Sequence, residues 1–271
     1  MGLTQKNVDG LHHLSNYGRI VLQQLPTLEF TYRHRDYFAN HILDHLPQDY
    51  LSRLGKLEVS TRTEDVIIGF YNVDRMIQEA EEYIWSITDQ YLVSQARYTE
   101  GALERGVAIR NLDAPYSVVI PAKEKPYEWN RPSFLESSAR AREEGRLQEK
   151  LMERIPVYLF MSEKEAAALA FPQEKGKFDY LGFTSTDEKF RHWCGDLFPH
   201  CWKEATHRSD IIEDRQKWLL KSPQPASALR ELAEEGESEQ GGVAELGEKG
   251  LARNGKLTYL GRVLYLKLLR T

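Results

Sequence analysis

The chain has 271 residues, of which 41% are hydrophobic and 11% are aromatic, so a buried core is expected and global disorder is excluded. Its length suits one α/β domain with smaller attachments. The formal net charge of -5 excludes a uniformly basic coat for nucleic acid but leaves local basic patches open. The chain has only two cysteines, no basic leader before an apolar run, and no apolar stretch of roughly 18 residues, so we expect a soluble, cytoplasmic protein.

The two ends of the chain carry the same short pattern, "HLSNYGRIV" and "KLTYLGRVL", about 240 residues apart. In each copy Gly-Leu is followed by a turn rich in Gly, Asp or Asn and by a short extended run. Ser15 or Thr258 then stands where an N-cap would accept a hydrogen bond from the following helix. The Asp-Gly and Asn-Gly pairs are typical of tight hairpins. Both ends are therefore predicted to form the strand-turn-strand-helix ending of a winged helix; an accidental match is the alternative.

The C-terminal copy is preceded by three helical patterns, which predicts a complete winged-helix domain over residues 206–271. The first pattern covers residues 210–220 and is ended by Pro223 and Pro225, and the second covers residues 226–234. The third is predicted to be capped by Ser238 and to run to Lys249. At the other end, residues 1–28 are expected to be a partial wing with the start of a linker helix, either a natural remnant or the result of a misplaced start.

The end of the chain from Lys249 onward is basic and contains no acidic residue, which favours contact with DNA phosphates. The predicted DNA-binding residues are Lys249, Arg253, Lys256 and Arg262. The acidic third helix is a poor reader of bases, so the alternative is that this domain serves dimerisation. The final helix, "RVLYLKLLR", carries more apolar surface than a small domain buries alone, which favours a partner and a homodimer.

The middle of the chain, residues 29–205, is predicted to be an α/β domain with a mixed sheet and flanking helices. A helical pattern interrupted at Pro26 leads into it, and charged helix ends precede apolar runs at residues 83–87 and 107–109. A loop over residues 115–133 and a charged helix over residues 134–153 follow. "IPVYLFMS" is the strongest strand pattern, "EAAALAFP" and "KFDYLGFTS" form a strand pair, and Thr186 is expected to cap the closing helix.

The segments "TLEFTYRHRDYFANH", "ALERGVAIR", "IPVYLFMSEKEAAALAFPQEKGKFDYLGFTSTDE" and "WCGDLFPHCW" together resemble archaeal winged-helix transcriptional regulators of the methanogenesis-regulator (FilR) type. The resemblance covers residues 1 to about 205 and rests on the strand pattern, a Gly-Lys-Phe-Asp turn and a Thr-Asp-Glu helix start. It implies promoter DNA as partner and a small-molecule sensor domain similar to a phospholipase D-like fold without its catalytic residues. The chain departs from the family by lacking most of the N-terminal winged helix and by having a second one after the sensor.

No catalytic signature is present, so we predict that the protein is not an enzyme and needs no cofactor. His-x-Lys, GxxxxGK(S/T) and GxGxxG are all absent. His41 and His45 lie one helical turn apart in the pattern but lack the Glu of a zinc protease. The cluster His192, Cys194, His200, Cys201 and His207 has an unusual spacing for zinc, so buried apolar thiols are the preferred interpretation and no metal is predicted.

A ligand pocket is expected at the carboxyl ends of the sheet strands, where ligands commonly bind in α/β folds. Trp85, Asp89 and Arg110 are the residues predicted to line it, with ordinary salt bridging as the alternative. The sequence thus predicts a homodimeric, cytoplasmic transcriptional regulator that binds double-stranded DNA and responds to a small-molecule effector. The alternative is a ligand-sensing or protein-interaction module that does not bind DNA and dimerises through the winged helix.

Overall fold

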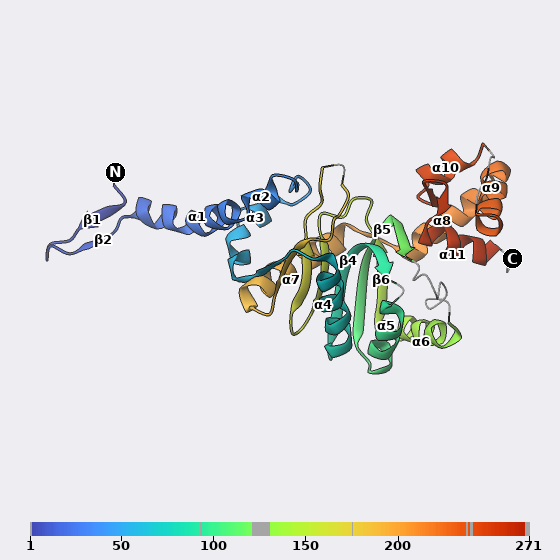
Figure 1. Cartoon of the computed structure of the whole chain (residues 1–271), viewed down its shortest axis with the longest axis horizontal. Helices are drawn as coiled ribbons and strands as arrows, with labels where there is room; N and C mark the ends of the chain where they lie inside the picture. Colours follow the sequence, from blue (N-terminus) through green and yellow to red (C-terminus); the bar gives the residue numbers. More distant parts are fainter. Residues whose placement is uncertain are drawn as a thin grey trace.

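The computed structural model describes residues 2–92, 94–120, 131–174, 176–236, 238 and 241–268. Its elements form an N-terminal arm, a central sheet with helices on both faces, and a C-terminal group of short helices (Figure 1). The architecture is mixed α/β, as the sequence predicted. Among the described residues, no helix has both the length and the apolar character needed to cross a bilayer.

The arm is a two-stranded hairpin at the end of a long helix, which stands away from the body (Figure 1). The elements up to the body are β1 (Thr4–Lys6), β2 (His12–Leu14), α1 (Asn16–Arg33), α2 (Arg35–Phe38), α3 (Gln48–Leu51) and η1 (Leu54–Val59). The predicted interruption at Pro26 is wrong, because α1 runs through it. A Cβ on Gly55 would lie 2.6 Å from the Cβ of Pro26, so this glycine lets η1 pack on the proline and support the helix there. The domain boundary expected after residue 28 falls inside α1.

The body is built on one eight-stranded mixed sheet. Its strands are β3 (Thr61–Thr63), β4 (Tyr83–Leu92), β5 (Ala108–Ile120), β6 (Leu147–Leu151), β7 (Tyr158–Ser162), β8 (Ala166–Ala170), β9 (Gly182–Ser185) and β10 (Thr206–His207). They are arranged in the order β10-β6-β5-β4-β7-β8-β9-β3. The strands β4, β5 and β6 are parallel, and every other neighbouring pair is antiparallel. The carboxyl ends of the three parallel strands therefore meet at one edge.

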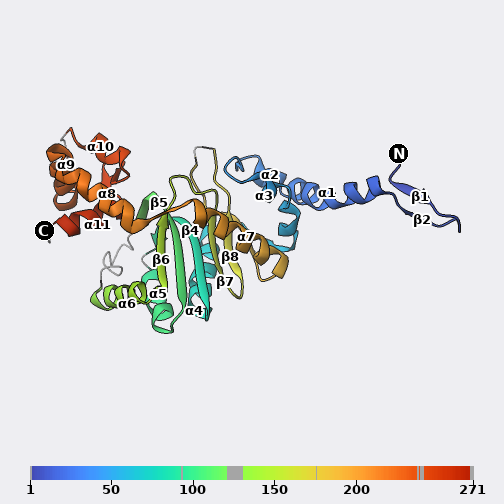
Figure 2. The same cartoon turned by 180° about the vertical axis from the view of Figure 1, so that it is seen from behind.

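Helices cover both faces of this sheet, as the views from front and back show (Figures 1 and 2). One face is covered by α4 (Val66–Glu79), α5 (Gln95–Glu104) and α6 (Pro132–Glu143), and the opposite face by α7 (Glu188–Glu204). Apolar residues of both layers are fully buried, among them Val73 of α4, Ile87 of β4 and Trp193 of α7. Burial on both sides explains the continuous apolar runs that predicted strands at β4 and β7.

Three boundaries in the body differ from the sequence prediction. The loop predicted over residues 115–133 begins as strand, because β5 continues to Ile120; residues 121–130 lie outside the described part of the chain. The helix predicted over residues 134–153 ends at Glu143 and is followed by β6, whose backbone pairs with β5. Pairing in the sheet thus overrides the helical propensity of its charged residues. The N-cap of α7 is Asp187, whose carboxylate accepts from the backbone N–H of Lys189 at 2.8 Å, and not Thr186.

The C-terminal part has its elements in the predicted order of three helices, a hairpin and a helix. They are α8 (Arg208–Leu220), α9 (Pro223–Glu234), α10 (Val243–Glu248), β11 (Ala252–Arg253), β12 (Lys256–Leu257) and α11 (Tyr259–Leu268). A separate apolar core joins them, with Leu219, Leu229 and Leu264 buried at its centre. The strand β10, placed by prediction in this part, instead pairs with β6 of the central sheet.

Two predictions for this part are wrong in detail. Ser238 does not cap α10, because the N-cap of that helix is Gly242. The hydroxyl of Ser238 instead donates a hydrogen bond to the carboxylate of Glu231. Pro223 was predicted only to end the preceding helix, but it is the first residue of α9. Proline fits this position because a backbone N–H there would have no partner within the helix. In α11, Leu260 and Leu264 are buried against the chain's own helices, and Val263 and Leu268 are half-buried. Leu269 and Arg270 lie outside the described residues, and a partner for this helix stays a prediction.

Candidate functional site

The N-terminal hairpin is locked to α1 through Ser15. Its hydroxyl donates to the carbonyl oxygen of Gly2 and accepts from the backbone N–H of Gly18 at 3.0 Å. Its own backbone N–H donates to the carbonyl oxygen of Leu3 at 2.9 Å. The N-cap thus joins the start of the first strand to the first turn of the helix, which fixes the angle between hairpin and helix.

The C-terminal hairpin has the same construction around Thr258. Its hydroxyl donates to the carbonyl oxygen of Gly250 at 2.7 Å and accepts from the backbone N–H of Gly261 at 3.1 Å. Its backbone N–H donates to the carbonyl oxygen of Leu251 at 3.0 Å. The repeated letters at the two ends therefore specify one local backbone arrangement, here called the hairpin-helix unit and formed by residues 2–19 and 250–262.

Arginine, lysine and histidine residues occupy equivalent positions in the two units. Arg19 and Arg262 directly follow the equivalent glycines, and both are exposed. His13 and Lys256 both directly precede the last residue of the second strand, and both are exposed. Each unit thus presents the same pair of positions, one on the hairpin and one on the helix, for contact with an anionic partner.

Three of the four predicted DNA-binding residues are exposed and one is half-buried. Lys256 and Arg262 are exposed, as such a contact requires. Lys249 is half-buried, with its ammonium 5.6 Å from the ring centroid of Trp218. Arg253 is exposed as well, and burial raises the pKa of the Asp89 carboxyl while the positive charge of Arg253 opposes that rise. The DNA contacts of all four residues stay a prediction.

The two units differ in what covers their apolar face. In the C-terminal unit Leu251, Leu257 and Leu260 are buried beneath the preceding helices. The equivalent Leu3 and Leu14 of the N-terminal unit remain 38% and 37% exposed. The arm therefore presents the surface that α8, α9 and α10 cover at the other end of the molecule.

The predicted ligand residues Trp85, Asp89 and Arg110 do not line one cavity. Trp85 stacks on Phe198 of α7 with ring centroids 4.8 Å apart, and Arg110 lies over Trp202 of the same helix at 5.8 Å. Asp89 accepts from the hydroxyl of Tyr180 at 3.0 Å, and burial raises the pKa of its carboxyl. The first two pack against α7, and none of the three lines the cavity described next.

A cavity lies on the opposite face, between the sheet and α4, α5 and α6. It has a volume of about 50 Å³, enough for several water molecules. Its floor is apolar, with Ile84, Ile109 and Phe160, whereas Ser86 and Asn111 supply polar groups in the next row of the sheet. On α6 the hydroxyl of Ser138 is buried without a hydrogen-bond partner in the described residues. The cavity thus combines an apolar wall with polar groups, as small-molecule sites do.

A buried charge cluster on β5 and β6 lies at this cavity, with Glu149 and Arg208 among its lining residues. The Arg208 guanidinium forms ion pairs with both Asp113 and Glu149. The hydroxyl of Tyr91 donates to Asp113, and Arg142 donates to Glu149 at 2.8 Å. The Asp113 side chain is only 1% exposed, so its charge depends on this pairing.

Arg208 is also the first residue of α8, so the cluster connects the cavity to the C-terminal part of the chain. Sequence reasoning missed it because an Arg after a short edge strand has no distinctive motif. The alternation of polar Ser86 and Asn111 with apolar neighbours in the buried strands β4 and β5 was the available signal.

The histidines and cysteines do not form a metal centre among the residues that the structure describes. His41 lies in an isolated bridge to Gln173 and not in a helix, so its predicted helical spacing to His45 does not exist. Its ring stacks on Tyr37 at 3.7 Å and contacts the carboxylate of Asp179. Cys194 and Cys201 are buried free thiols in the packed face of α7.

Comparison with known proteins gives no family assignment. The sequence matches no protein-family model, and no curated protein matches it. Among solved structures, it is similar to TrmBL2, described as an archaeal chromatin protein with a novel mode of DNA binding, at 11% identity and a TM-score of 0.39 over 76% of this chain and 77% of that one. It is also similar to Nuc from Salmonella typhimurium, a phospholipase D family member, at 10% identity and a TM-score of 0.32 over 51% of this chain and 89% of that one.

Proposed function

We propose that the protein is a DNA-binding transcriptional regulator whose body senses a small molecule. In this proposal residues 206–271 form a winged-helix domain, residues 2–19 form a second wing, and both touch duplex DNA through exposed cations. The cavity above β4 and β5 receives the effector. The protein acts as a cytoplasmic dimer and carries out no catalysis.

The observation that carries the DNA-binding part is the matching placement of an exposed arginine on two similar backbone frames. Arg19 and Arg262 are each the fourth residue of their helix and directly follow the glycine that approaches the backbone of the first strand's start. The exposed residues His13 and Lys256 hold the matching position on the second strand. A hairpin followed by a capped helix offers phosphate oxygens both positive charge and backbone donors, so one frame used twice favours one type of partner.

Arg208 supports the sensing part because it belongs to both the cavity and α8. A ligand that hydrogen-bonds Glu149 competes with the guanidinium for the same carboxylate. Occupancy would then change the position of the start of α8, and with it the domain that carries Lys256 and Arg262. The resulting shift in DNA affinity depends on the difference between the ligand's affinities for the two positions of α8, with and without the Arg208–Glu149 ion pair.

Fluorescence anisotropy with a labelled duplex, titrated at several salt concentrations, tests the DNA-binding part. We expect binding that weakens steeply with salt, because each phosphate contact releases counterions. Arg262→Gln and Arg19→Gln should each weaken binding and lower the salt slope by about 1. A duplex of unrelated sequence should respond in the same way.

The matched control is Lys217→Gln, which removes an exposed cation of α8 that already pairs with Glu213 at 2.6 Å. Its salt slope should equal that of the unchanged protein. Absence of binding at low salt would contradict the proposal and favour an interaction module. Equal losses in all three variants would show that overall charge, and not the hairpin-helix units, attracts the duplex.

A further inference from the structure

The floor of the cavity beneath α4, α5 and α6 consists of two parallel rows of side chains on β4, β5 and β6. The first row is formed by Ile84, Ile109 and Leu147, and the second row, two residues further along each strand, is formed by Ser86, Asn111 and Glu149. Both rows face the cavity, because residues two apart in a strand point to the same side of a sheet. A molecule that lies along the strands therefore meets an apolar row at one end and a polar row at the other.

Two polar side chains of this cavity have hydrogen-bonding capacity that the described residues do not use. The hydroxyl of Ser86 donates to Oδ1 of Asn111 at 2.8 Å, so the N–H groups of the Asn111 amide still need an acceptor. Opposite the floor, Ser138 of α6 is only 1% exposed, and its hydroxyl has no partner in the described part of the chain. A buried polar group without a partner is costly, so both groups favour a bound molecule that accepts hydrogen bonds.

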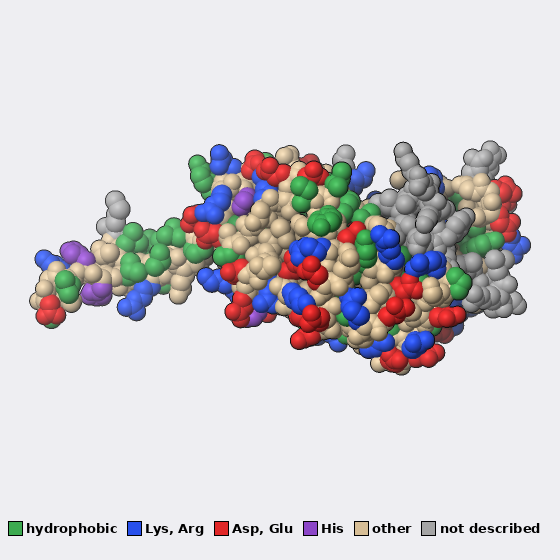
Figure 3. Space-filling model, turned by 60° about the horizontal axis from the view of Figure 1, so that its bottom comes forward, with side chains coloured by type: hydrophobic (Ala, Val, Ile, Leu, Met, Phe, Trp, Pro, Cys, Tyr) green, Lys and Arg blue, Asp and Glu red, His purple; other side chains and the backbone are tan. Residues whose placement is uncertain are grey.

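The charges at the polar end of the cavity are paired with one another. Glu149 accepts from Arg142 at 2.8 Å and forms an ion pair with Arg208, which also pairs with Asp113. A ligand with a full charge would enter this paired cluster without a new counter-charge, and its desolvation would not be offset. On the surface of the body, basic and acidic side chains are interspersed (Figure 3), so the outer field does not select a charged molecule either. The site therefore favours a neutral ligand.

The volume of the cavity limits the size of the ligand. One water-sized group needs about 10–15 Å³, so the cavity of about 50 Å³ holds roughly four or five non-hydrogen atoms. The free energy that each atom of a small ligand contributes has an upper limit, which places the dissociation constant no lower than on the order of 10⁻⁵ M. The ligand is thus a small and abundant molecule rather than a large one bound at trace concentration.

We propose that this cavity binds a neutral short-chain primary amide, which rests on the proposed function in that the cavity is the effector site. The alkyl end lies on the apolar row, the carbonyl oxygen accepts from Asn111 and Ser138, and the amide N–H donates to Glu149. A carboxylate of the same size lacks the donor for Glu149, and an ammonium ion lacks the acceptor for Asn111 and Ser138. Donation to Glu149 also supplies the competition with Arg208 by which the effector acts on α8.

Nuclear magnetic resonance titration of the full chain without DNA tests the ligand class. The probes are propanamide, propionate and propylammonium, which have nearly the same size and differ in charge. We expect saturable binding of propanamide, with the largest amide shifts at residues 84–86, 109–111 and 147–149, and binding of the two ions that is at least about tenfold weaker. Absence of saturable propanamide binding, shifts confined to other parts of the chain, or equal binding of propionate would overturn the proposal.

Ser138→Ala separates a ligand-binding hydroxyl from a structural one. Because this hydroxyl has no partner among the described residues, its removal should leave the Tm of the unliganded protein unchanged or raise it, while propanamide binding weakens about tenfold. The matched control is Ser133→Ala, which changes an exposed serine of the same helix and should alter neither quantity. A lower Tm with unchanged propanamide binding would show that the hydroxyl serves the fold, and would overturn its role in the site.

DNA-binding anisotropy with and without propanamide separates this proposal from the proposed function. If propanamide binds the cavity and changes the affinity for the duplex, both stand. If it binds the cavity and the affinity for the duplex stays the same, or the chain binds no duplex, the ligand assignment stands and the regulatory role fails. If the duplex binds but propanamide does not, the ligand assignment fails and the DNA-binding part is unaffected.

Discussion

The carbonyl oxygen of Leu3 occupies the place where a side chain on Gly18 would begin. A Cβ built on Gly18 would lie 1.9 Å from that oxygen, and one built on Gly261 would lie 2.1 Å from the equivalent oxygen of Leu251. No side chain tolerates such a distance. The two glycines are therefore required for the first strand of each hairpin to cross the start of its helix.

Gly261→Ala should destabilise the C-terminal part by about 2 kcal/mol or more, because the Cβ forces buried backbone to move. Chemical denaturation followed by tryptophan fluorescence measures this loss. Gly247→Ala is the matched control: its Cβ would meet the carbonyl oxygen of Ala252 at an ordinary 3.8 Å. Alanine there should be neutral or stabilising by up to about 1 kcal/mol, since it restricts the unfolded chain.

Gly18→Ala should release the N-terminal hairpin from α1 without unfolding the body. The strands β1 and β2 are exposed along their whole length, so little other than this junction holds them. Hydrogen exchange should show lost protection at residues 3–15 and unchanged protection in β4 and β7. Global unfolding of this variant at 25 °C would show that the arm supports the body, contrary to this expectation.

Arg208→Gln should cost about 3–5 kcal/mol of unfolding free energy, because it leaves Asp113 and Glu149 as buried, incompletely paired carboxylates. Thermal and urea denaturation measure the change. Adding Asp113→Asn and Glu149→Gln should recover part of the loss, since the unpaired charges are then gone. Arg140→Gln, which changes an exposed arginine of α6, should be nearly neutral. A nearly neutral Arg208→Gln would show that the ion pairs carry no stability.

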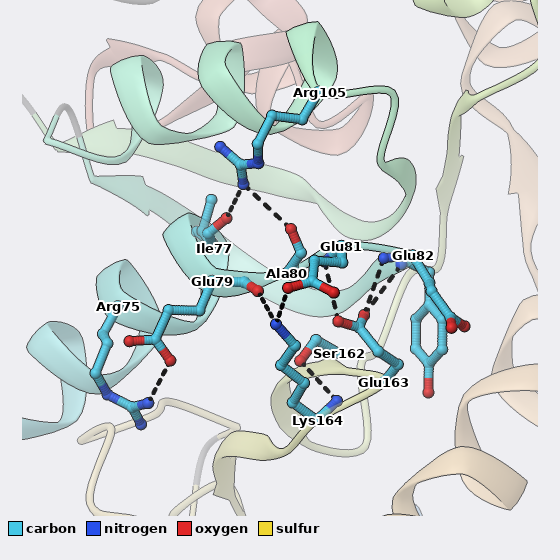
Figure 4. A network of polar contacts seen from close by, with 11 residues as sticks. Arg75, Ile77, Glu79, Ala80, Glu81, Glu82, Arg105, Ser162, Glu163 and Lys164 are labelled. Carbon is cyan, nitrogen blue, oxygen red and sulfur yellow. Dashed lines mark hydrogen bonds and ion pairs between the residues drawn. The ribbon is translucent and has the colours of Figure 1, made fainter.

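Glu163 should make stability depend on acid pH. Its carboxylate faces the start of β4 and accepts from the backbone N–H groups of Glu81, Glu82 and Tyr83 at 2.9, 3.3 and 3.2 Å (Figure 4). Partial burial alone would raise the pKa of Glu163, but these hydrogen bonds outweigh it and the pKa is lowered. Its stabilising contribution is therefore fully present above the ordinary pKa of a glutamate and is lost as the pH falls through the lowered value.

Glu163→Gln is expected to lower the unfolding free energy by about 1 kcal/mol at pH 7, and the difference from the unchanged protein should shrink below about pH 4. Urea denaturation at a series of pH values provides the comparison. Glu104→Gln, on the exposed side of α5, should show no difference at any pH. If the unfolding free energy of Glu163→Gln stayed below that of the unchanged protein by the same amount down to pH 3, the negative charge of Glu163 would not be the source of its stabilising effect.

Both native thiols should be unreactive in the folded protein. Burial raises the pKa of Cys201 to about 12 and also raises the pKa of Cys194. At pH 8 the thiolate fraction of Cys201 is then on the order of 10⁻⁴. A disulfide reagent should modify neither thiol in native buffer and both in urea, with rates followed by absorbance. Rapid modification of either native thiol would show that α7 opens on the timescale of the reaction.

The sequence by itself determined the elements whose cause is local. The paired glycines and the hydroxyls of Ser15 and Thr258 act within about fifteen residues, so the two hairpin-helix units could be predicted from their letters. The strands β4, β7, β8 and β9 were also predictable, because burial on both sides leaves a continuous apolar run. The charged segment around β6 was mistaken for helix, since its strand exists only by pairing with β5.

Only the tertiary structure decided which side chains meet. Trp85, Asp89 and Arg110 all lie on the neighbouring strands β4 and β5, yet the pleat directs Trp85 and Arg110 to α7, and the cavity opens on the other face with Ser86 and Asn111. Arg208 reaches Asp113 and Glu149 from nearly a hundred residues and from 59 residues away, respectively. Such contacts depend on how the sheet and helices are layered, and no local pattern in the chain encodes them. The same holds for α1, where the fold determined which side of an apolar helix is covered and which remains free.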